Sequence, residues 1–531
     1  MVDTANSIFR DYVIDGVPSS GSKKPEKAKI REWGTDVEAT RARYVATRAA
    51  LKALDTTRDT IACLTESGRE GVFVWRAGDY SVQIAADASE GVYVKATAIA
   101  GSAGAWVRVF SGGIDESWFG AIGDGVTDDT IALQATLALA KALKVAWWPR
   151  ARTYKTTATL DAGTIGNAGG LIIRGANRQR TIISAAHSNP ILRLGGSAAT
   201  AFTERVLVED IQFSAFAGST PSAGIECWDI VHSTFNRVLA KGCTDGVRLN
   251  GGIANVLNDI EVEGNVRGIF ATSFVSSAGG GYPNHNVVRD SKIKNNTSWG
   301  IDFANGNMLV VDACDIEGNG TNGVPLSGAI RVRNVGTAIT APYSTGASIS
   351  GCWFEANSGG GVVIFNSGQN SIRDCLFAFN ANATYDIYYD TAVVQIVNTQ
   401  HHTSKTPHIT DNGLAVVSGS TINGAKAPAG VTANITANRL YTTVDGNSRL
   451  EGTATFDPAS LADAAGVTTT VTVTGAALGD MAMASFSLAL QGITVTAWVS
   501  AANTVSVRFQ NESGGVLDLA SGTLKAWVLK S

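Results

Sequence analysis

The chain has little charge, and several features that would mark other classes of protein are missing. Only 17% of its 531 residues are charged, and 42 basic against 46 acidic residues leave a formal net charge of -4. No cluster of Lys and Arg is interleaved with aromatic residues, which argues against nucleic acid as a partner. The N-terminus lacks a secretory signal pattern, and no run of 18 apolar residues occurs, so the sequence predicts no membrane insertion.

Metal, redox and nucleotide chemistry also lack their usual motifs. The six cysteines show neither CxxC nor zinc-type spacing, and we expect them to be small buried apolar residues and the protein to need no cofactor or metal. No HExxH, GxSxG or P-loop phrase occurs. The adjacent His401 and His402 are predicted to be solvent-exposed rather than ligands.

The chain is rich in glycine, with 58 residues, and contains many short segments of β-forming residues. This composition favours an all-β fold. One eight-residue pattern recurs at intervals of 22 to 38 residues, as expected for a solenoid with loops of variable length. Its copies are EDIQFSAF at 209–216, NRVLAKGC at 236–243, NDIEVEGN at 258–265, RDSKIKNN at 289–296, DACDIEGN at 312–319, SGCWFEAN at 350–357 and RDCLFAFN at 373–380.

A second strand follows the first in most copies, as in GIECW at 224–228 and GIDFA at 300–304. Alternation predicts two inward columns of apolar residues. The first is Phe213, Ala240, Val262, Ile293, Ile316, Phe354 and Phe377, and the second is Ile225, Val247, Ile269, Ile301, Ile330 and Val362. The asparagines that end the first strand, from Asn265 to Asn380, are predicted to stack as a structural ladder.

Other parts of the chain differ from the repeat. Residues 1–45 are polar and punctuated by Pro and Gly, the stretch from Val37 to Leu54 is predicted to be helical, and 46–112 read as a small β-domain. The repeat region, with an amphipathic helix at its start, occupies 113–420. Residues 421–531 end in alternating strands that predict a β-sandwich.

The phrase WFGAIGDGVTDDTIALQ at 118–134 resembles the segment that opens the pectate-lyase-like right-handed β-helix of bacteriophage tailspikes and polysaccharide depolymerases. The resemblance extends over roughly residues 45 to 420. It implies a right-handed parallel β-helix with small N-terminal domains and a C-terminal β-sandwich, assembled as a homotrimer. It also implies a virion tail or baseplate location, with residues 1–45 contacting other tail proteins and with release from the bacterial cytoplasm by lysis.

Outward side chains of successive coils form rows in which chemistry can be sought. The middle of the first-strand face holds Asp315, Glu317, Trp353 and Glu355, and register predicts that Glu317 and Glu355 are neighbours. Carboxylates at about 5 Å suit a nucleophile with an acid/base, and a wider spacing of about 6.5 to 9.5 Å suits inversion. Trp353 offers an apolar plane for a sugar ring.

Glu263, Lys294 and Arg331 are predicted to help bind substrate, and Asp302 is a further candidate acid. The alternatives are ordinary: Glu263, Lys294 and Glu317 can form an exposed charge ladder, and Asp302 with Arg331 a salt bridge. Two long insertions, at 271–285 and 321–346, are predicted to wall the site.

These observations give three competing functions. The first is endo-acting cleavage of a bacterial surface polysaccharide, such as capsule, lipopolysaccharide or exopolysaccharide, with hydrolysis favoured over elimination. The second is a receptor-binding spike that only adheres to the polysaccharide, and the third is a purely structural tail protein. The polygalacturonase motifs and the acidic calcium cluster of pectate lyases are missing, so neither mechanism is transferred.

Overall fold

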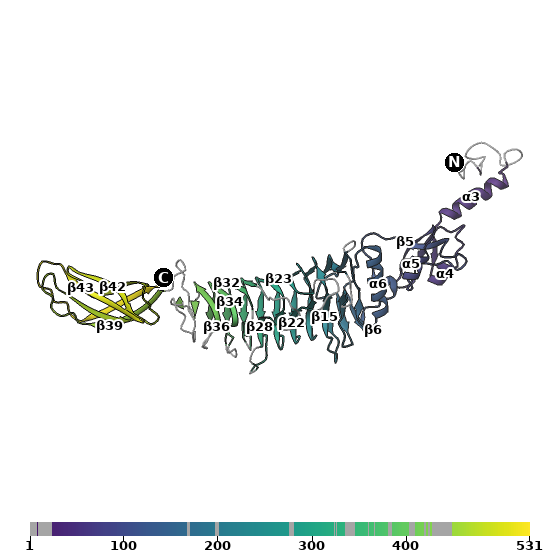
Figure 1. The fold of residues 1–531 in the computed structure, drawn as a ribbon. Helices are drawn as coiled ribbons and strands as arrows, with labels where there is room; N and C mark the ends of the chain where they lie inside the picture. The colour runs from purple at the N-terminus through teal and green to yellow at the C-terminus, as the bar shows by residue number, and fades with distance from the viewer. Residues whose placement is uncertain are drawn as a thin grey trace, which may run out of the picture.

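The computed structural model describes residues 8, 24–166, 170–196, 201–274, 281–322, 324, 327–334, 346–358, 360–365, 367–380, 385–402, 409–418, 421–422, 425–426 and 449–530. Figure 1 shows these residues as an elongated molecule, with a small N-terminal sheet, a long central stack of strands and a C-terminal pair of sheets.

The N-terminal part is a helix followed by a five-stranded sheet of order β1-β2-β3-β5-β4. Its elements are α3 (Lys27–Thr40), β1 (Arg43–Val45), α4 (Arg48–Lys52), β2 (Ile61–Leu64), β3 (Gly71–Ala77), α5 (Ser81–Ala86), β4 (Tyr93–Val94) and β5 (Gly104–Arg108). The continuous helix predicted from Val37 to Leu54 is therefore wrong. It is interrupted because Arg43–Val45 pairs with β2 and buries Val45 in the core of this sheet.

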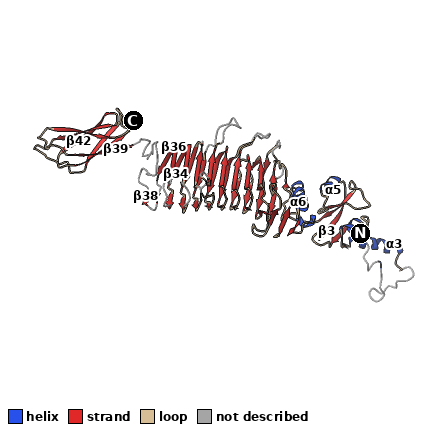
Figure 2. Ribbon diagram, turned by 90° about the horizontal axis from the view of Figure 1, so that it is seen from below, coloured by secondary structure: helices blue, strands red, loops and turns tan. Residues whose placement is uncertain are grey.

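The central stack begins with η2 (Glu116–Phe119), β6 (Asp124–Asp128) and the helix α6 (Thr130–Leu143). Leu133 and Leu137 of α6 are fully buried in the core that the helix shares with the strands below it. Figure 2 shows α6 lying across the N-terminal end of the stacked strands. The helix thus covers an end that would otherwise expose apolar side chains and unpaired strand edges.

Each coil of the stack contributes three strands, which form three parallel columns. The first column is β7 (Thr153–Thr156), β10 (Ile182–Ala185), β14 (Gln212–Ala215), β18 (Leu239–Lys241), β21 (Glu261–Glu263), β24 (Lys292–Lys294), β27 (Asp315–Glu317), β30 (Trp353–Glu355), β33 (Leu376–Ala378), β35 (Gln400–His402) and β37 (Thr421–Ile422). The second is β8 (Leu160–Asp161), β11 (Leu192–Leu194), β15 (Ala223–Trp228), β19 (Asp245–Asn250), β22 (Arg267–Thr272), β25 (Trp299–Ala304), β28 (Gly328–Arg333) and β31 (Val362–Phe365).

The third column is β9 (Leu171–Arg174), β13 (Val206–Glu209), β17 (Thr234–Asn236), β20 (Val256–Asn258), β23 (Asn284–Arg289), β26 (Asn307–Asp312), β29 (Ala347–Ser350) and β32 (Gln369–Arg373). In the last coils, β34 (Ile387–Val397) is one long strand that pairs with β31 of the second column and with β32 of the third column. The strand β36 (Ile409–Ser418) pairs with β34 along its length. The short strands β12 (Thr203–Glu204) and β16 (Ile230–Val231) pair with each other, and β38 (Ala425–Lys426) pairs with β37. The chain is a right-handed parallel β-helix, as predicted. The third column was not predicted.

The interior confirms both predicted apolar columns, because every residue named for them is at most 2% exposed. The asparagine ladder is also confirmed. Each side-chain amide donates to the Oδ1 of the next asparagine, at 3.0 Å from Asn265 to Asn296 and 2.8 Å from Asn296 to Asn319. The series continues through Asn357 to Asn380. The buried amides of these successive coils are thereby paired, and the bonds hold the coils in register.

The turn between the third and first strands repeats one backbone conformation. The residue two positions before the first strand has a positive φ, as in Asp259 at 47° and Asp290 at 52°. Gly351 occupies the same place with φ 61°. Short polar side chains and glycine tolerate this left-handed region and occupy this position in most coils, although Arg237 and Ala313 also adopt it, each with φ 51°.

His401 is a correction to the sequence analysis. It is fully buried, not solvent-exposed, and its ring stacks on Phe377 at 4.8 Å between centroids. The physical reason is register, because His401 is the strand partner of Phe377 and so continues the first inward column. Its Nδ1 lies 3.0 Å from a carboxylate oxygen of Asp386.

The C-terminal part consists of two three-stranded antiparallel sheets that enclose a common core. Their orders are β39-β44-β41 and β40-β43-β42. The strands are β39 (Arg449–Phe456), β40 (Gly466–Thr472), β41 (Met481–Phe486), β42 (Ile493–Ala501), β43 (Thr504–Asn511) and β44 (Gly522–Leu529). Val507, Phe509 and Ala526 are fully buried between the sheets. This is the predicted sandwich.

Candidate functional site

The outward side of the first column carries a band of charged residues around one exposed tryptophan. We call this band the Trp353 face, and it consists of Glu261, Glu263, Lys294, Asp315, Glu317, Trp353 and Glu355 on β21, β24, β27 and β30. The predicted register is confirmed: Glu317 pairs with Glu355, and Asp315 pairs with Trp353. Since neighbouring strands lie about 4.8 Å apart, the side chains of Glu317 and Glu355 leave the backbone as direct neighbours.

Trp353 and Glu355 are joined to each other. The indole is 45% exposed, and its Nε1 donates a hydrogen bond of 3.1 Å to Oε2 of Glu355. This bond holds the carboxylate beside the ring, and Glu317 in the neighbouring coil is exposed. The arrangement places an aromatic plane and two carboxylates within one patch of surface.

Lys294 is paired within the Trp353 face, but with Glu261 rather than with the predicted ladder partner Glu263. Its Nζ lies 2.7 Å from Oε1 of Glu261. This hydrogen bond raises the pKa of Lys294, and the charges of Glu261, Glu263 and Glu317 add to the effect. Glu317 and Glu263 therefore share the field of one ammonium group, in a setting that remains accessible to solvent.

The second column treats its outward charges differently, and Asp302 is the clearest case. Asp302 is fully buried and accepts two hydrogen bonds from Arg331, at 2.9 and 2.6 Å, and two from Arg333, both at 3.0 Å. Burial alone would raise the pKa of Asp302, but the bonds from the two arginines outweigh it and the pKa lies below its usual value. The salt-bridge alternative is therefore the one that the structure shows.

Arg331, predicted to bind substrate, is occupied by the same network. Its guanidinium pairs with Asp302 and lies 4.7 Å from the ring centroid of Trp299. Two further carboxylates of this column, Glu226 and Asp245, are also buried and paired with arginines. Sequence reasoning offered the pair of Asp302 with Arg331 as an alternative but missed the rest of this network, although Arg and acidic residues alternate visibly along the outward row.

The two insertions predicted to wall the site lie partly outside the described residues, since 275–280, 323, 325–326 and 335–345 are not described. An aromatic contact is among those described for the first insertion. Phe274 meets the ring of Trp228 edge-on, with centroids 5.0 Å apart.

Chemically, the Trp353 face combines two carboxylates with one exposed aromatic plane. The backbones of the two strands lie about 4.8 Å apart, and this spacing allows the carboxyl groups to approach the separation of about 5 to 5.5 Å used by retaining enzymes. Within the described residues no three His, Cys, Asp or Glu side chains gather as a metal site, and no helix there is long and apolar enough to span a membrane.

Comparison with known proteins agrees with this architecture. The model of the right-handed beta helix region matches residues 223–401. The gp42 tailspike of Acinetobacter phage vb_AbaP_AS12 superposes with a TM-score of 0.53 at 12% identity, over 93% of this chain and 94% of that one. The enzymatically active domain of tailspike protein 2 from bacteriophage CBA120 gives 0.52 at 12% identity, over 93% and 82%.

The chain has the β-helix fold of phage tailspikes. The two superpositions extend well beyond the β-helix, because each covers 93% of the chain. No curated protein matches the sequence. With identities this low, the likeness establishes the tailspike fold, and the chemistry must be argued from the residues of this chain.

Proposed function

We propose that the chain is a tailspike subunit that binds a bacterial surface polysaccharide and cleaves it at the Trp353 face. The observation that carries the proposal is the register pairing of Glu317 with Glu355, beside the exposed ring of Trp353. The tailspike fold supports a polysaccharide as the substrate class, and the pair of carboxylates supports hydrolysis.

The roles follow from position. Trp353 lies beneath the C–H face of one sugar ring, and Glu355, held by the indole Nε1, is fixed next to the bond to be broken. Glu317 in the neighbouring coil approaches from the other side of that bond. In a retaining reaction one carboxylate attacks the anomeric carbon while the other protonates the leaving oxygen, and water later releases the sugar.

Asp315 is the reserve acid, because it is the register partner of Trp353 and is partly exposed. Lys294 and Glu263, one coil and two coils from Glu317, extend the binding surface along the column. Asp302 and Arg331 are left out of the acid/base machinery, since each already saturates the other with hydrogen bonds.

The test is to incubate the purified chain with polysaccharides from candidate host strains and to follow chain length by size-exclusion chromatography. Cleavage within the chain shifts the whole polymer peak to smaller sizes early in the reaction. Binding without any shift would support the alternative of a non-catalytic receptor-binding spike. Absence of both binding and shift across the panel would contradict the proposal.

We also propose that three copies assemble, with residues 1–45 attaching the trimer to the tail and the C-terminal sheets contributing to the contact between copies. Met481 and Trp498 on β41 and β42 are exposed apolar side chains suited to such a contact. Light scattering should give about three times the chain mass of 55.2 kDa. A mass of one chain in native buffer would rule the trimer out.

A further inference from the structure

The second column contains a hollow that the proposed function does not use. Two adjoining cavities, of about 400 and 350 Å³, share Asp161 and Gly163 in their walls. The first extends to Lys141 on the capping helix α6, and the second extends to Trp228 on β15. We call the two together the Trp228 groove. Each volume lies within the range of about 300–1,000 Å³ that is usual for small-molecule sites.

The groove exists because glycines stand where neighbouring coils would carry side chains. Gly195 follows Leu194, whose register partner is Cys227, so it lies alongside Trp228. A Cβ on Gly195 would lie 2.5 Å from the carbonyl oxygen of Trp228, and its φ of 83° is one that other residues rarely adopt. The space beside the indole therefore cannot be filled from this position.

The polar wall of the groove is held in a fixed geometry. Arg193 lies between two carboxylates, with its Nε 2.8 Å from Oε2 of Glu226 and its Nη1 3.6 Å from Oδ2 of Asp161. Glu226 is almost fully buried and is held from the other side by Arg248 at 3.1 Å. Its oxygens cannot turn away, which is the preorganisation that a binding site for hydroxyl groups requires.

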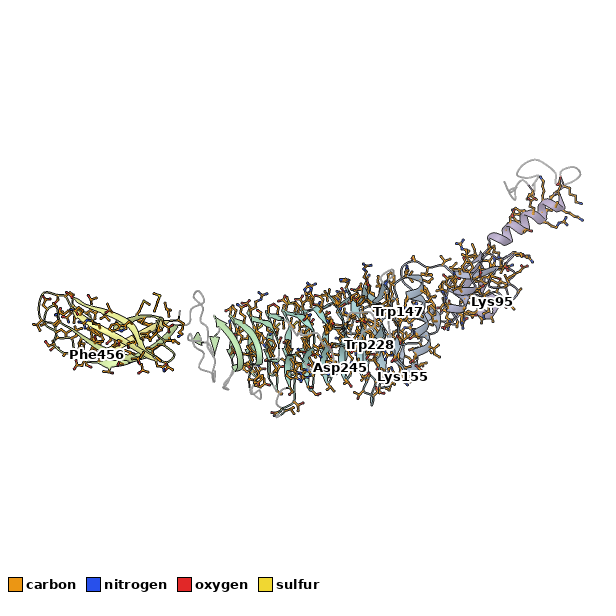
Figure 3. All side chains as sticks on the ribbon, in the orientation of Figure 1. Lys95, Trp147, Lys155, Trp228, Asp245 and Phe456 are labelled. Atoms are coloured by element: carbon orange, nitrogen blue, oxygen red, sulfur yellow. The ribbon has the colours of Figure 1, made fainter. Side chains whose placement is uncertain are left out.

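Trp228 supplies the apolar wall. Phe274 meets its ring at 5.0 Å and 88°, which limits rotation of the indole. Figure 3 labels Trp228 on the body of the β-helix, toward the end that carries α6. A fixed aromatic plane beside carboxylate and guanidinium groups is the combination that receives a sugar ring, with its C–H face on the indole and its hydroxyls on the charged groups.

The charged residues that line the groove indicate whether it binds a neutral or an acidic sugar. Lys141 and Arg193 contribute two positive charges to the groove, and Asp161 and Glu226 contribute two negative charges, so the four cancel. Arg193 is already shared between two carboxylates, and the ammonium group of Lys141 donates to the carbonyl oxygen of Ala162, so both cations of the groove already have partners. We infer that the Trp228 groove binds a short neutral oligosaccharide, as a second polysaccharide site distinct from the Trp353 face.

The two surfaces belong to different columns and different coils, since Trp228 lies on β15 and Trp353 on β30. A polymer held at the groove stays near the chain when it is released from the Trp353 face. The inference stands without the proposed catalysis, because the groove needs no cleavage to bind.

The experiment is isothermal titration calorimetry of the full chain with gluco-, galacto- and manno-hexasaccharides, and with hexagalacturonate as the charged comparator. We expect binding of at least one neutral hexasaccharide and at least about tenfold weaker binding of hexagalacturonate. Trp228→Ala should weaken the neutral binding by at least about tenfold, because it removes the stacking plane. Gly196→Phe should do the same by filling the groove, since a Cβ there meets nothing within 4 Å.

Trp148→Ala is the matched control, because Trp148 is also exposed, at 44%, and its neighbour Trp147 bridges to Ile173 of the third column. This variant should bind as the parent does. If Trp228→Ala does not fold, as judged by circular dichroism, Gly196→Phe decides. Absence of binding to every neutral hexasaccharide overturns the inference. Binding that survives both groove variants but is lost in Trp353→Ala also overturns it, while leaving the proposed function intact.

Discussion

The outward faces of the first and second columns are built from similar charged residues but treat them in opposite ways. On the first column Glu317 is exposed and the indole of Trp353 is 45% exposed. On the second column Asp245 and Asp302 are fully buried, and each is bonded by two arginines. Inward and outward residues alternate along the strands of both columns. The outward carboxylates of the first column are nevertheless in contact with water, whereas those of the second column are buried under arginines, and we call this second surface the sealed face.

The difference distinguishes carboxylates that stabilise the fold from carboxylates that can exchange a proton with a substrate. A carboxylate that is buried and saturated by guanidinium groups cannot accept or deliver a proton to a substrate without breaking its pairs. A carboxylate in contact with water, next to a second one and to an aromatic plane, can do so. The comparison therefore favours the first column for the proposed catalysis and assigns the buried carboxylates of the second column to coil-to-coil stability.

The largest expected change in stability comes from removing a buried carboxylate of the second column. Asp302→Asn removes the charge that pairs Arg331 and Arg333, and leaves two arginines without a partner carboxylate. We expect a loss of about 3 to 5 kcal/mol in the stability of the β-helix, seen as a lower thermal transition in calorimetry. Asp315→Asn, on the partly exposed first column, should shift that transition little. Equal shifts for the two variants would erase the distinction.

The pH dependence of the thermal transition tests the same role of Asp302. The pKa of Asp302 in the folded chain lies below its usual value near 3.8, so its contribution is complete above that value. It is lost as the pH falls below 3.8 toward the folded pKa, because protonation then favours the unfolded chain. The thermal transition of the parent should drop over this acidic range, and Asp302→Asn should drop less. A parallel course of the two curves would contradict the role given to Asp302.

Substitutions on the Trp353 face should change the rate of cleavage and not the stability. Glu317→Gln and Glu355→Gln keep the shape and remove the charge, so each should lose at least about 100-fold in the rate of polysaccharide cleavage while keeping binding. Initial rates come from new reducing ends, and binding from retention on immobilised polysaccharide. The thermal transition should stay at the parental value, since Glu317 is exposed and Glu355 partly so. Parental rates in both variants would move the chemistry away from the Trp353 face.

Much of this architecture could be predicted from one sequence, because a β-helix repeats the same local rule in each coil. The inward position of Ile316 and Phe354 fixes the register, and the register fixes Glu317 beside Glu355. The ladder through Asn319 and Asn357 followed from the same alignment. Residues that obey the repeat were placed correctly although their partners lie far away in sequence.

The failures occur where a residue's environment is set by neighbouring coils and not by its own strand. His401 looked like a surface residue because histidine is usually polar, but it is buried as the next member of an apolar column. Alternation marked Asp302 as outward and offered a salt bridge with Arg331, but it did not predict that Arg333 would join the pair and that Asp302 would be fully buried. The Trp228 groove depends on the missing side chain of Gly195, which no strand pattern marks.

The smallest expected effect is at Lys294, and it tests whether exposure alone separates the two faces. The side chains of Lys294 and Glu261 are 29% and 12% exposed, so their ion pair is partly screened by water. We expect a coupling of at most about 1 kcal/mol in a double-mutant cycle of Lys294→Gln and Glu261→Gln, and a smaller value in high salt. Because the pKa of Lys294 is raised, this contribution is complete below the usual value of 10.5 and disappears only as the pH rises beyond it. Arg331→Gln on the sealed face should cost several times as much, since it leaves part of Asp302 unpaired in a buried site. A coupling for Lys294 as large as the cost of Arg331→Gln would mean that the first column is also held by its charges, and its carboxylates would then be less free for chemistry.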